Sequence, residues 1–168
     1  FPFDKFATAS NKLSTQMKAT GEVMSIGRTL EESFLKAVRS LEIGVCHMHM
    51  PKFDNTPDAA LLQYVSIGTD DRLFAIAELL RRGVDASTIC NHTQIDMLFL
   101  DKIHNIVELE REIKDEPITR ENLLRAKRMG FSDRHLAHLW KCSEQDVAEK
   151  RRELGVRPVY KMIDTCAS

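Results

Sequence analysis

Two pairs of histidines are the residues with the most obvious potential for chemistry in this chain. His47 and His49 stand two apart in the run CHMHM, beside Cys46, and strand alternation would place both rings on one face. His135 and His138 stand three apart, which places them on one face of a helix. Imidazole and thiolate bind zinc, but such a site needs three or four ligands. No further ligand stands close in sequence to either pair, so we predict no metal site.

Motifs for catalysis or nucleotide binding are missing from the sequence. It has no Gly-x-Gly-x-x-Gly loop, no P-loop, and no Ser/His/Asp or Cys/His pairing of the catalytic kind. Lys18, Glu22 and Arg28 are the charged residues nearest to phosphate-type chemistry, and surface ion pairs explain them more simply. We therefore assign no catalytic residue and no cofactor-binding residue.

The stretch 130–155 has the pattern of a helix-turn-helix, two short helices joined by a tight turn. Ala137 and Val147 stand at positions expected to be buried. A DNA-reading second helix needs basic and amide side chains that face the groove. Here four acidic side chains, from Glu144 to Glu153, stand among three basic ones. The acids would meet phosphates, so we favour a structural helical hairpin and expect no nucleic-acid partner. A stand-alone DNA-binding module and a helical interaction module remain the alternatives.

Helical periodicity and capping residues organise the chain from Thr69 onward. The central element is 95–114, where Asp96 is placed as the N-cap and apolar residues recur at i, i+3, i+4 and i+7. Thr69/Asp70, Asp85, Thr119, Ser132 and Ser143 are the caps expected for the other helices. The sequence thus predicts helices over 71–82, 86–91, 95–114, 120–129, 133–140 and 144–154.

The first part of the chain mixes strand and helix signals. A short strand is expected at Glu22–Ile26, between Gly21 and Gly27, and a helix at 29–42 with Thr29 and Glu32 as a capping box. One strand cannot form a sheet, so we expect this part to belong to a longer chain. A hairpin with residues 3–7 is the alternative.

Residues 45–68 are the least regular stretch. We expect a linker there, with one short helix at 57–65. A β-rich run, PVYKMI, follows the last helix at 158–163, and we expect it to begin a further strand.

Composition narrows the class of protein. The chain is 43% hydrophobic and 29% charged, with a formal net charge of -1, which argues against a general polyanion binder. Residues 69–118 hold five more acids than bases, and 119–157 hold four more bases than acids. This asymmetry would support contact between the two parts or between copies of the chain. The four cysteines form no CxxC pair, and no apolar run is long enough for a membrane span, so we expect a cytoplasmic protein with free thiols and no membrane partner.

Several segments, in order, resemble the large chain of carbamoyl-phosphate synthase. TQMKATGEVMSIGR (15–28) resembles the segment that closes its first ATP-grasp module, and TLEESFLKAVRSLE (29–42) resembles the following helix. IDMLFLDKIHNIVELE and KRMGFSDRHLAHL resemble helices of its oligomerisation domain. PVYKMIDTCA resembles the junction with the second synthetase half. Residues 45–67 match poorly.

The resemblance implies a mainly α fold: a helical oligomerisation domain preceded by a strand-plus-helix remnant of an α+β ATP-grasp module. It divides the chain into 1–44, the end of the first ATP-grasp module; 45–68, a linker; 69–157, the all-α oligomerisation domain; and 158–168, the start of the connection to the second half. The family's enzyme makes carbamoyl phosphate from bicarbonate, glutamine-derived ammonia and two ATP, for arginine and pyrimidine biosynthesis.

Partners and cofactors also follow from the resemblance. They are the remaining large-chain domains, a glutaminase small chain, further copies of the chain, and ATP with Mg or Mn in the parent enzyme. The family's ATP and metal residues match no position here, so we expect this segment to be structural and inactive alone.

Overall fold

The computed structural model describes residues 8, 10, 12–15, 17 and 23–164. This part of the chain forms eight α-helices and one 3₁₀ helix, η2. They are α1 (Leu30–Ser40), η2 (Pro51–Phe53), α2 (Asp58–Val65), α3 (Arg72–Arg81), α4 (Ala86–Thr93), α5 (Met97–Lys114), α6 (Arg120–Met129), α7 (Asp133–Trp140) and α8 (Glu144–Glu153).

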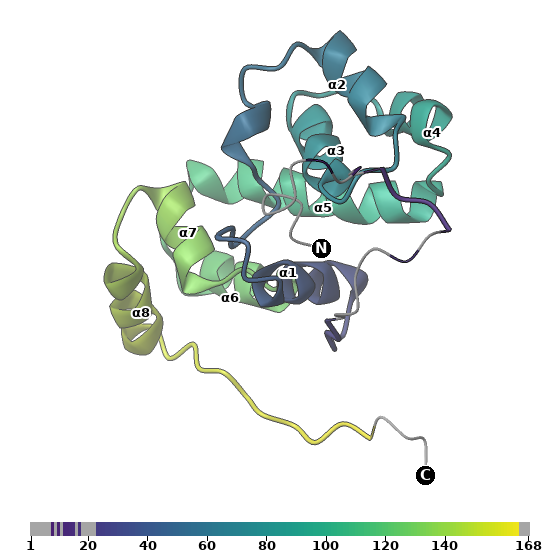
Figure 1. Ribbon diagram of the computed structural model, residues 1–168. Coiled ribbons are helices and arrows are strands. Elements are labelled where there is room, and N and C mark those ends of the chain that lie inside the picture. The colour runs from purple at the N-terminus through teal and green to yellow at the C-terminus, as the bar shows by residue number, and fades with distance from the viewer. Residues whose placement is uncertain (1–7, 9, 11, 16, 18–22, 165–168) are drawn as a thin grey trace.

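Helix α5 crosses the middle of the molecule, as Figure 1 shows. Helices α3 and α4 pack on α5, and α2 packs on both of them. Helices α1, α6 and α7 also pack on α5, while α8 packs on α7. The mainly α fold expected from the sequence is confirmed.

The apolar stripe of α5 is the centre of the hydrophobic core. Leu100, Ile106 and Ile113 are fully buried, and Ile103 is 2% exposed. Burial of each such side chain contributes roughly 1.5–3 kcal/mol relative to exposure. Because helices from both ends of the chain pack on this stripe, α5 ties the sequence-distant elements into one body.

Most predicted N-caps form. The side chains of Asp96, Thr119 and Ser132 each accept a hydrogen bond from a backbone N–H in the first helical turn. Ser143 forms a full capping box with Asp146. Thr29 accepts from the Glu32 N–H, but the Glu32 carboxylate accepts from the Arg28 N–H at 2.8 Å, so this predicted box is only half formed.

One predicted cap residue is wrong, and another is right but makes no side-chain hydrogen bond to its helix. The N-cap residue of α3 is Asp71, not Thr69 or Asp70, and it makes no side-chain cap hydrogen bond. Its carboxylate is occupied by Lys52, by the Tyr64 hydroxyl at 2.6 Å and by the Thr69 hydroxyl at 2.8 Å. Asp85 is the N-cap residue of α4, but its carboxylate accepts from the Ser87 hydroxyl instead of a backbone N–H. In both cases other side chains, local or distant in sequence, bind the carboxylate in place of the N–H groups of the first helical turn.

The strand expected at 22–26 does not form in its described part, Val23–Ile26. Polar groups here bond to α1 instead of to a neighbouring strand. Ser25 Oγ donates to the Ser33 carbonyl at 2.8 Å, and Lys36 Nζ donates to the Ile26 carbonyl at 2.8 Å. The alternative hairpin with residues 3–7 lies outside the described residues.

The segment 45–68 is packed into the helical body. It forms η2 and α2, and its side chains Met48, Phe53, Leu61 and Val65 are buried in the core. The helix expected at 57–65 therefore forms, and the stretch around it is not a free spacer. The division of the chain at residues 44, 68 and 157 stays a prediction.

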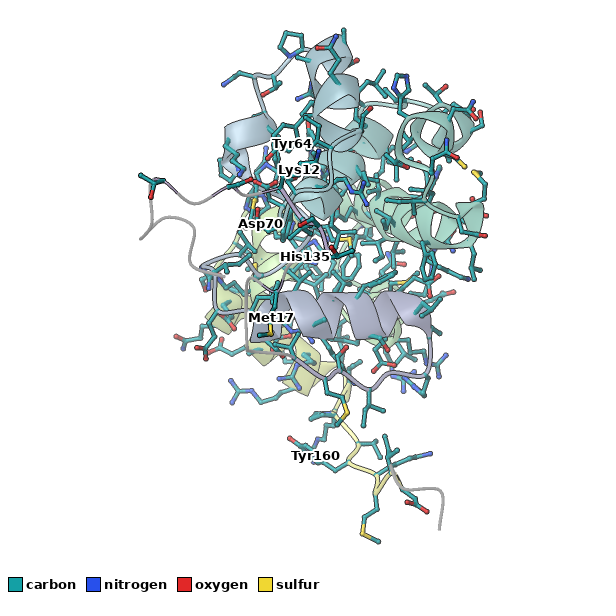
Figure 2. All side chains as sticks on the ribbon, turned by 45° about the vertical axis from the view of Figure 1, so that its right-hand side comes forward. Lys12, Met17, Tyr64, Asp70, His135 and Tyr160 are labelled. Carbon is teal, nitrogen blue, oxygen red and sulfur yellow. The ribbon has the colours of Figure 1, made fainter. Side chains whose placement is uncertain are left out.

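The run 158–163 is neither helix nor strand. It continues from α8 as an extended tail that leads away from the helices (Figure 1). Its side chains are open to solvent, with Tyr160 92% exposed. Figure 2 shows Tyr160 far from His135, which lies inside the helical body.

Candidate functional site: a buried network of histidines and a carboxylate

Four buried or half-buried polar side chains from four parts of the chain meet beside α5. His47 comes from the loop after α1, Arg81 from the end of α3, Glu110 from α5 and His135 from α7. Glu110 is 5% exposed, His47 8%, and His135 is fully buried. Charged groups at this depth are stable only when partners compensate them.

Arg81 neutralises Glu110. Its Nη2 lies 2.9 Å and its Nε 3.3 Å from Glu110 Oε2. The same guanidinium donates to Glu78 at 2.8 Å and to the Met48 carbonyl at 3.1 Å. Burial lowers the pKa of Arg81, but Glu110 and Glu78 more than offset this and raise it. Arg81 thereby connects α3, α5 and the loop that carries His47.

The two buried imidazoles lie next to the other oxygen of Glu110. His135 Nε2 is 3.0 Å and His47 Nδ1 is 3.8 Å from Oε1. Neither contact is aligned as a hydrogen bond, and these three atoms have no aligned partner among the described residues. Burial raises the pKa of Glu110, but the His135 ring and the Arg81 guanidinium lower it to about 2. The carboxylate is therefore ionised at neutral pH.

Both imidazoles are held in the neutral form. Burial, followed by the nearby His135, lowers the pKa of His47 to about 3, although Glu110 opposes this. Burial also lowers the pKa of His135, again against Glu110. A general acid or base works best with a pKa near the working pH. These rings are therefore poorly suited to proton transfer at neutral pH.

The rings form a column that runs from the core toward the surface. Phe131 stacks on His135 with ring centroids 4.2 Å apart, and His135 stacks on His47 at 4.4 Å with planes 5° apart. His49 continues the column at 5.5 Å from His47. His138 flanks His47 at 5.2 Å. Ring stacking thus joins α7 to the loop after α1.

A metal ion does not fit this arrangement. The ligand atoms of His47, Glu110 and His135 lie within 4.8 Å of one another, which is compatible with the size of a metal site. However, an imidazole binds a metal through a lone pair in the plane of its ring. The parallel rings of His47 and His135 are stacked face to face, so one ion cannot lie in both planes. The second group, His49, Asp54 and Glu78, fails because Arg81 and Arg82 occupy both oxygens of Glu78.

A surface pocket of about 1250 Å³ opens beside this network. It is lined by His47, His49, His138, Arg81 and Glu110, and by polar residues of α5. The charged groups at its inner wall, Arg81 and Glu110, are already paired with each other. Because these charges are satisfied within the protein, the network serves to hold α3, α5, α7 and the loop after α1 together.

The structure brings together residues that sequence reasoning treated separately. Neither pair, His47/His49 or His135/His138, has a further ligand close in sequence, but in the structure the two pairs form one cluster. Glu110 is a buried acidic residue of the central helix that the sequence analysis did not single out. Its position offered a signal, because it stands three residues after Val107 and three before Ile113, on the apolar stripe. Of the three charged residues considered for phosphate-type chemistry, Lys18 and Glu22 lie outside the described residues, so the structure places only Arg28.

The hairpin of α7 and α8 has the expected buried residues, with Ala137 7% exposed and Val147 fully buried. Two of the three basic side chains of α8 form ion pairs within the protein. Arg151 pairs with Asp133 at 3.2 Å, and Lys150 pairs with Glu153 at 3.0 Å. Lys150 and Arg151 would have to give up these pairs to contact phosphates.

Comparison with known families decides the relationship. Residues 22–155 match the family described as carbamoyl-phosphate synthetase large chain, oligomerisation domain. The chain belongs to this family. The match covers α1 to α8 and the buried network, including the segment 45–68. The resemblance seen in the sequence motifs is therefore confirmed, and the helical body is an oligomerisation domain of the carbamoyl-phosphate synthetase large chain. In the described part of the chain, no helix is both long and apolar enough to cross a membrane.

Proposed function

We propose that this chain is the structural, self-associating segment of a carbamoyl-phosphate synthetase large chain. The observation that carries the proposal is the family match over 22–155. The central position of α5 and the buried, internally paired network support a role in holding elements together. In the parent enzyme, this segment joins a first half that phosphorylates bicarbonate to a second half that phosphorylates carbamate.

The proposal includes the partners of the parent enzyme. These are the other large-chain domains, a glutaminase small chain that supplies ammonia, and ATP with Mg or Mn bound outside this segment. A cytoplasmic setting is compatible with three half-buried thiols, Cys46, Cys90 and Cys142, that form no disulfide. No residue here is proposed to touch ATP, the metal ions or bicarbonate.

An activity assay tests the non-catalytic role. The chain is incubated with bicarbonate, ammonia, ATP and Mg²⁺, and both ADP release and carbamoyl phosphate are measured. We expect neither product above the level of a protein-free control. ADP release that depends on the chain would contradict the proposal. A mobility-shift assay with duplex DNA should likewise show no salt-sensitive binding, since acidic side chains balance the basic ones on α8 and two of its three cations, Lys150 and Arg151, are engaged in ion pairs.

A further inference from the structure

Four imidazole rings from two segments meet beside α5. His47 and His49 stand on the loop 45–50, and His135 and His138 stand on α7. The His47 and His135 rings are almost parallel, with their centroids 4.4 Å apart. The ring of His138 lies 5.2 Å and that of His49 lies 5.5 Å from the ring of His47. These four rings form the imidazole stack, which joins the loop to α7.

The loop 45–50 is neither helix nor strand, so contacts with individual groups fix its position. The Met48 side chain is fully buried in the core, and the Met48 carbonyl accepts from Arg81 Nη2 at 3.1 Å. His49 Nε2 lies 2.8 Å from Asp54 Oδ1. Toward α7, the loop is held by the imidazole stack. Separation of the stacked rings therefore frees the loop from α7.

Helix α7 is anchored to the rest of the body by contacts that do not involve the loop. Leu136 is fully buried, and Trp140 Nε1 donates to the Ile113 carbonyl of α5 at 2.8 Å. The N-cap residue Ser132 accepts from the His135 N–H at 3.0 Å, and α8 packs on the helix. Helix α7 can therefore keep its place when the loop moves.

One carboxylate serves both inner rings of the stack. His135 Nε2 lies 3.0 Å and His47 Nδ1 lies 3.8 Å from Glu110 Oε1. The other oxygen, Oε2, is paired with Arg81. Glu110 carries a single negative charge, so it cannot balance Arg81 and two imidazolium rings at once. Burial makes an uncompensated charge costly at this position.

The charged groups farther from the inner rings are already engaged. Glu78 is shared between Arg81 and Arg82. Asp54 is paired with His49. The two outer rings of the stack reach solvent, and protons on them add positive charge beside the inner rings. The surroundings of the stack therefore offer no second carboxylate for a second buried imidazolium.

We propose that the imidazole stack is an acid-sensitive latch. Both inner rings are neutral while the loop 45–50 lies on α7, and uptake of one proton by each ring releases the loop with the helices still folded. Two imidazolium rings 4.4 Å apart repel each other, whereas separation and water remove this repulsion in the released state. Burial of Met48 opposes release, so the loop stays in place at neutral pH.

The direction of the pH effect follows from the state of the inner rings. Burial is the main cause that lowers the pKa of both rings, that of His47 to about 3. In the released loop the His47 ring lies in water, where its pKa is ordinarily about 6.5. Acid therefore favours the released state, which binds more protons. Release uncovers Glu110 and Arg81 at the wall of the pocket of about 1250 Å³ and so changes the shape and charge of that pocket.

Met48 reports on release, because its side chain is fully buried while the loop is in place. Dilute hydrogen peroxide oxidises exposed thioethers much faster than buried ones. The oxidation rate of Met48 divided by that of the exposed Met162 thus measures the released fraction. Because each bound proton contributes a factor of about ten per pH unit, release with two protons should raise this ratio about a hundredfold per unit below roughly pH 6.5. Peptide mass spectrometry between about pH 5.5 and 4.5 measures it.

Ring replacements separate the two protons. His47→Phe and His135→Phe each keep an aromatic ring in the stack but remove one titrating group, so the ratio should rise only about tenfold per pH unit. His92→Phe, at an exposed position of α4 outside the stack, is the matched control and should keep the hundredfold dependence. Circular dichroism checks that each variant is folded, and either ring variant suffices for the comparison.

Urea separates local release from complete unfolding. Unfolding exposes far more surface than release of one loop, so its equilibrium constant depends much more steeply on urea. We expect Met48 oxidation at about pH 5 to be nearly independent of urea below the unfolding transition. The latch is overturned if Met48 oxidation follows the urea dependence of unfolding, if the ratio does not change with pH in the parent, or if the ring variants keep the hundredfold dependence.

Discussion

At the scale of single residues, the pair Arg81–Glu110 is the most consequential contact in the described structure. It lies beside α5, and each partner satisfies a charge that burial would otherwise penalise. Loss of one member of a buried ion pair is far more costly than loss of an exposed pair, because the remaining charge has no solvent to replace its partner.

Glu110→Gln should lower the free energy of unfolding by about 3 kcal/mol, because Arg81 keeps its charge and loses the more deeply buried of its two carboxylate partners. Chemical denaturation of the variant and the parent measures the difference. Glu112→Gln is the control. Glu112 lies on α5 like Glu110, but it forms an exposed ion pair with Arg125, so its loss should cost less than about 1 kcal/mol. Equal stability of the Glu110→Gln variant and the parent would contradict the role given to this pair.

The neutral imidazoles predict a pH dependence of stability. The pKa of His47 is about 3 in the folded chain and ordinarily about 6.5, so below pH 6.5 the unfolded chain binds a proton that the folded chain does not. The contribution of the neutral His47 ring to the free energy of unfolding should therefore be fully present above pH 6.5 and be lost progressively as the pH falls. At pH 5 the loss is about 2 kcal/mol from this ring alone.

Denaturation curves between pH 7.5 and 5 measure this loss. The variant His47→Asn should show a flatter profile over the same range, whatever its absolute stability. The carboxylates with lowered pKa, such as Glu110 and Asp133, lose their contribution only at lower pH, so they do not confuse the comparison. A parent profile that stays flat from pH 7.5 to 5 would show that His47 is not buried in the neutral form.

At the scale of elements, the close contact between α1 and the end of α6 depends on Gly130. This residue has a φ of +102°, and a Cβ built on it would lie 2.9 Å from the Glu32 Cα atom. Arg39 also donates to the Gly130 carbonyl at 2.7 Å, so both ends of α1 are tied to this turn. Backbone strain and a steric clash thus coincide at one position.

Gly130→Ala should cost about 2–3 kcal/mol of stability, because the positive φ is unfavourable for alanine and the added methyl group pushes α1 away. Gly83→Ala is the matched control. Gly83 also has a positive φ, of +84°, but nothing lies within 4 Å of its added Cβ, so only the strain of about 1 kcal/mol applies. Thermal unfolding should show a larger decrease in Tm for Gly130→Ala than for Gly83→Ala. Equal decreases would contradict the steric clash between the added methyl group and α1.

Most helices could be predicted because their signals are local. Helix α6 has the predicted bounds, as does α7, and α5 begins two residues later than expected. Apolar spacing and side-chain caps are contained within one helix length, so they can be recognised without knowledge of the fold. The cap of α3 could not be predicted in this way, because the partners of Asp71 include Lys52 and Tyr64, which η2 and α2 position.

The buried network needed tertiary information. The distance in sequence from His47 to His135 gives no indication that α7 stacks the two rings face to face. The predicted strand at 22–26 failed for a related reason, because Lys36 of α1 donates to the Ile26 carbonyl, a group that a neighbouring strand would otherwise bind. Local patterns therefore predicted the elements, whereas the contacts between distant elements decided the site.

At the scale of the whole molecule, the helices form one body around α5 and the exposed tail 158–164 leads away from α8. The buried network joins α3, α5 and α7 with the loop after α1, so it connects elements on both sides of the central helix. Such a body is suited to hold attached segments in fixed positions while its outer surface remains available to other chains.

Sedimentation equilibrium of the unmodified chain tests the central claim most directly, because the proposed role requires self-association. We expect the apparent mass to rise with protein concentration, from 19.2 kDa toward twice that value. A mass that stays at that of a single chain at every concentration and salt would contradict the account.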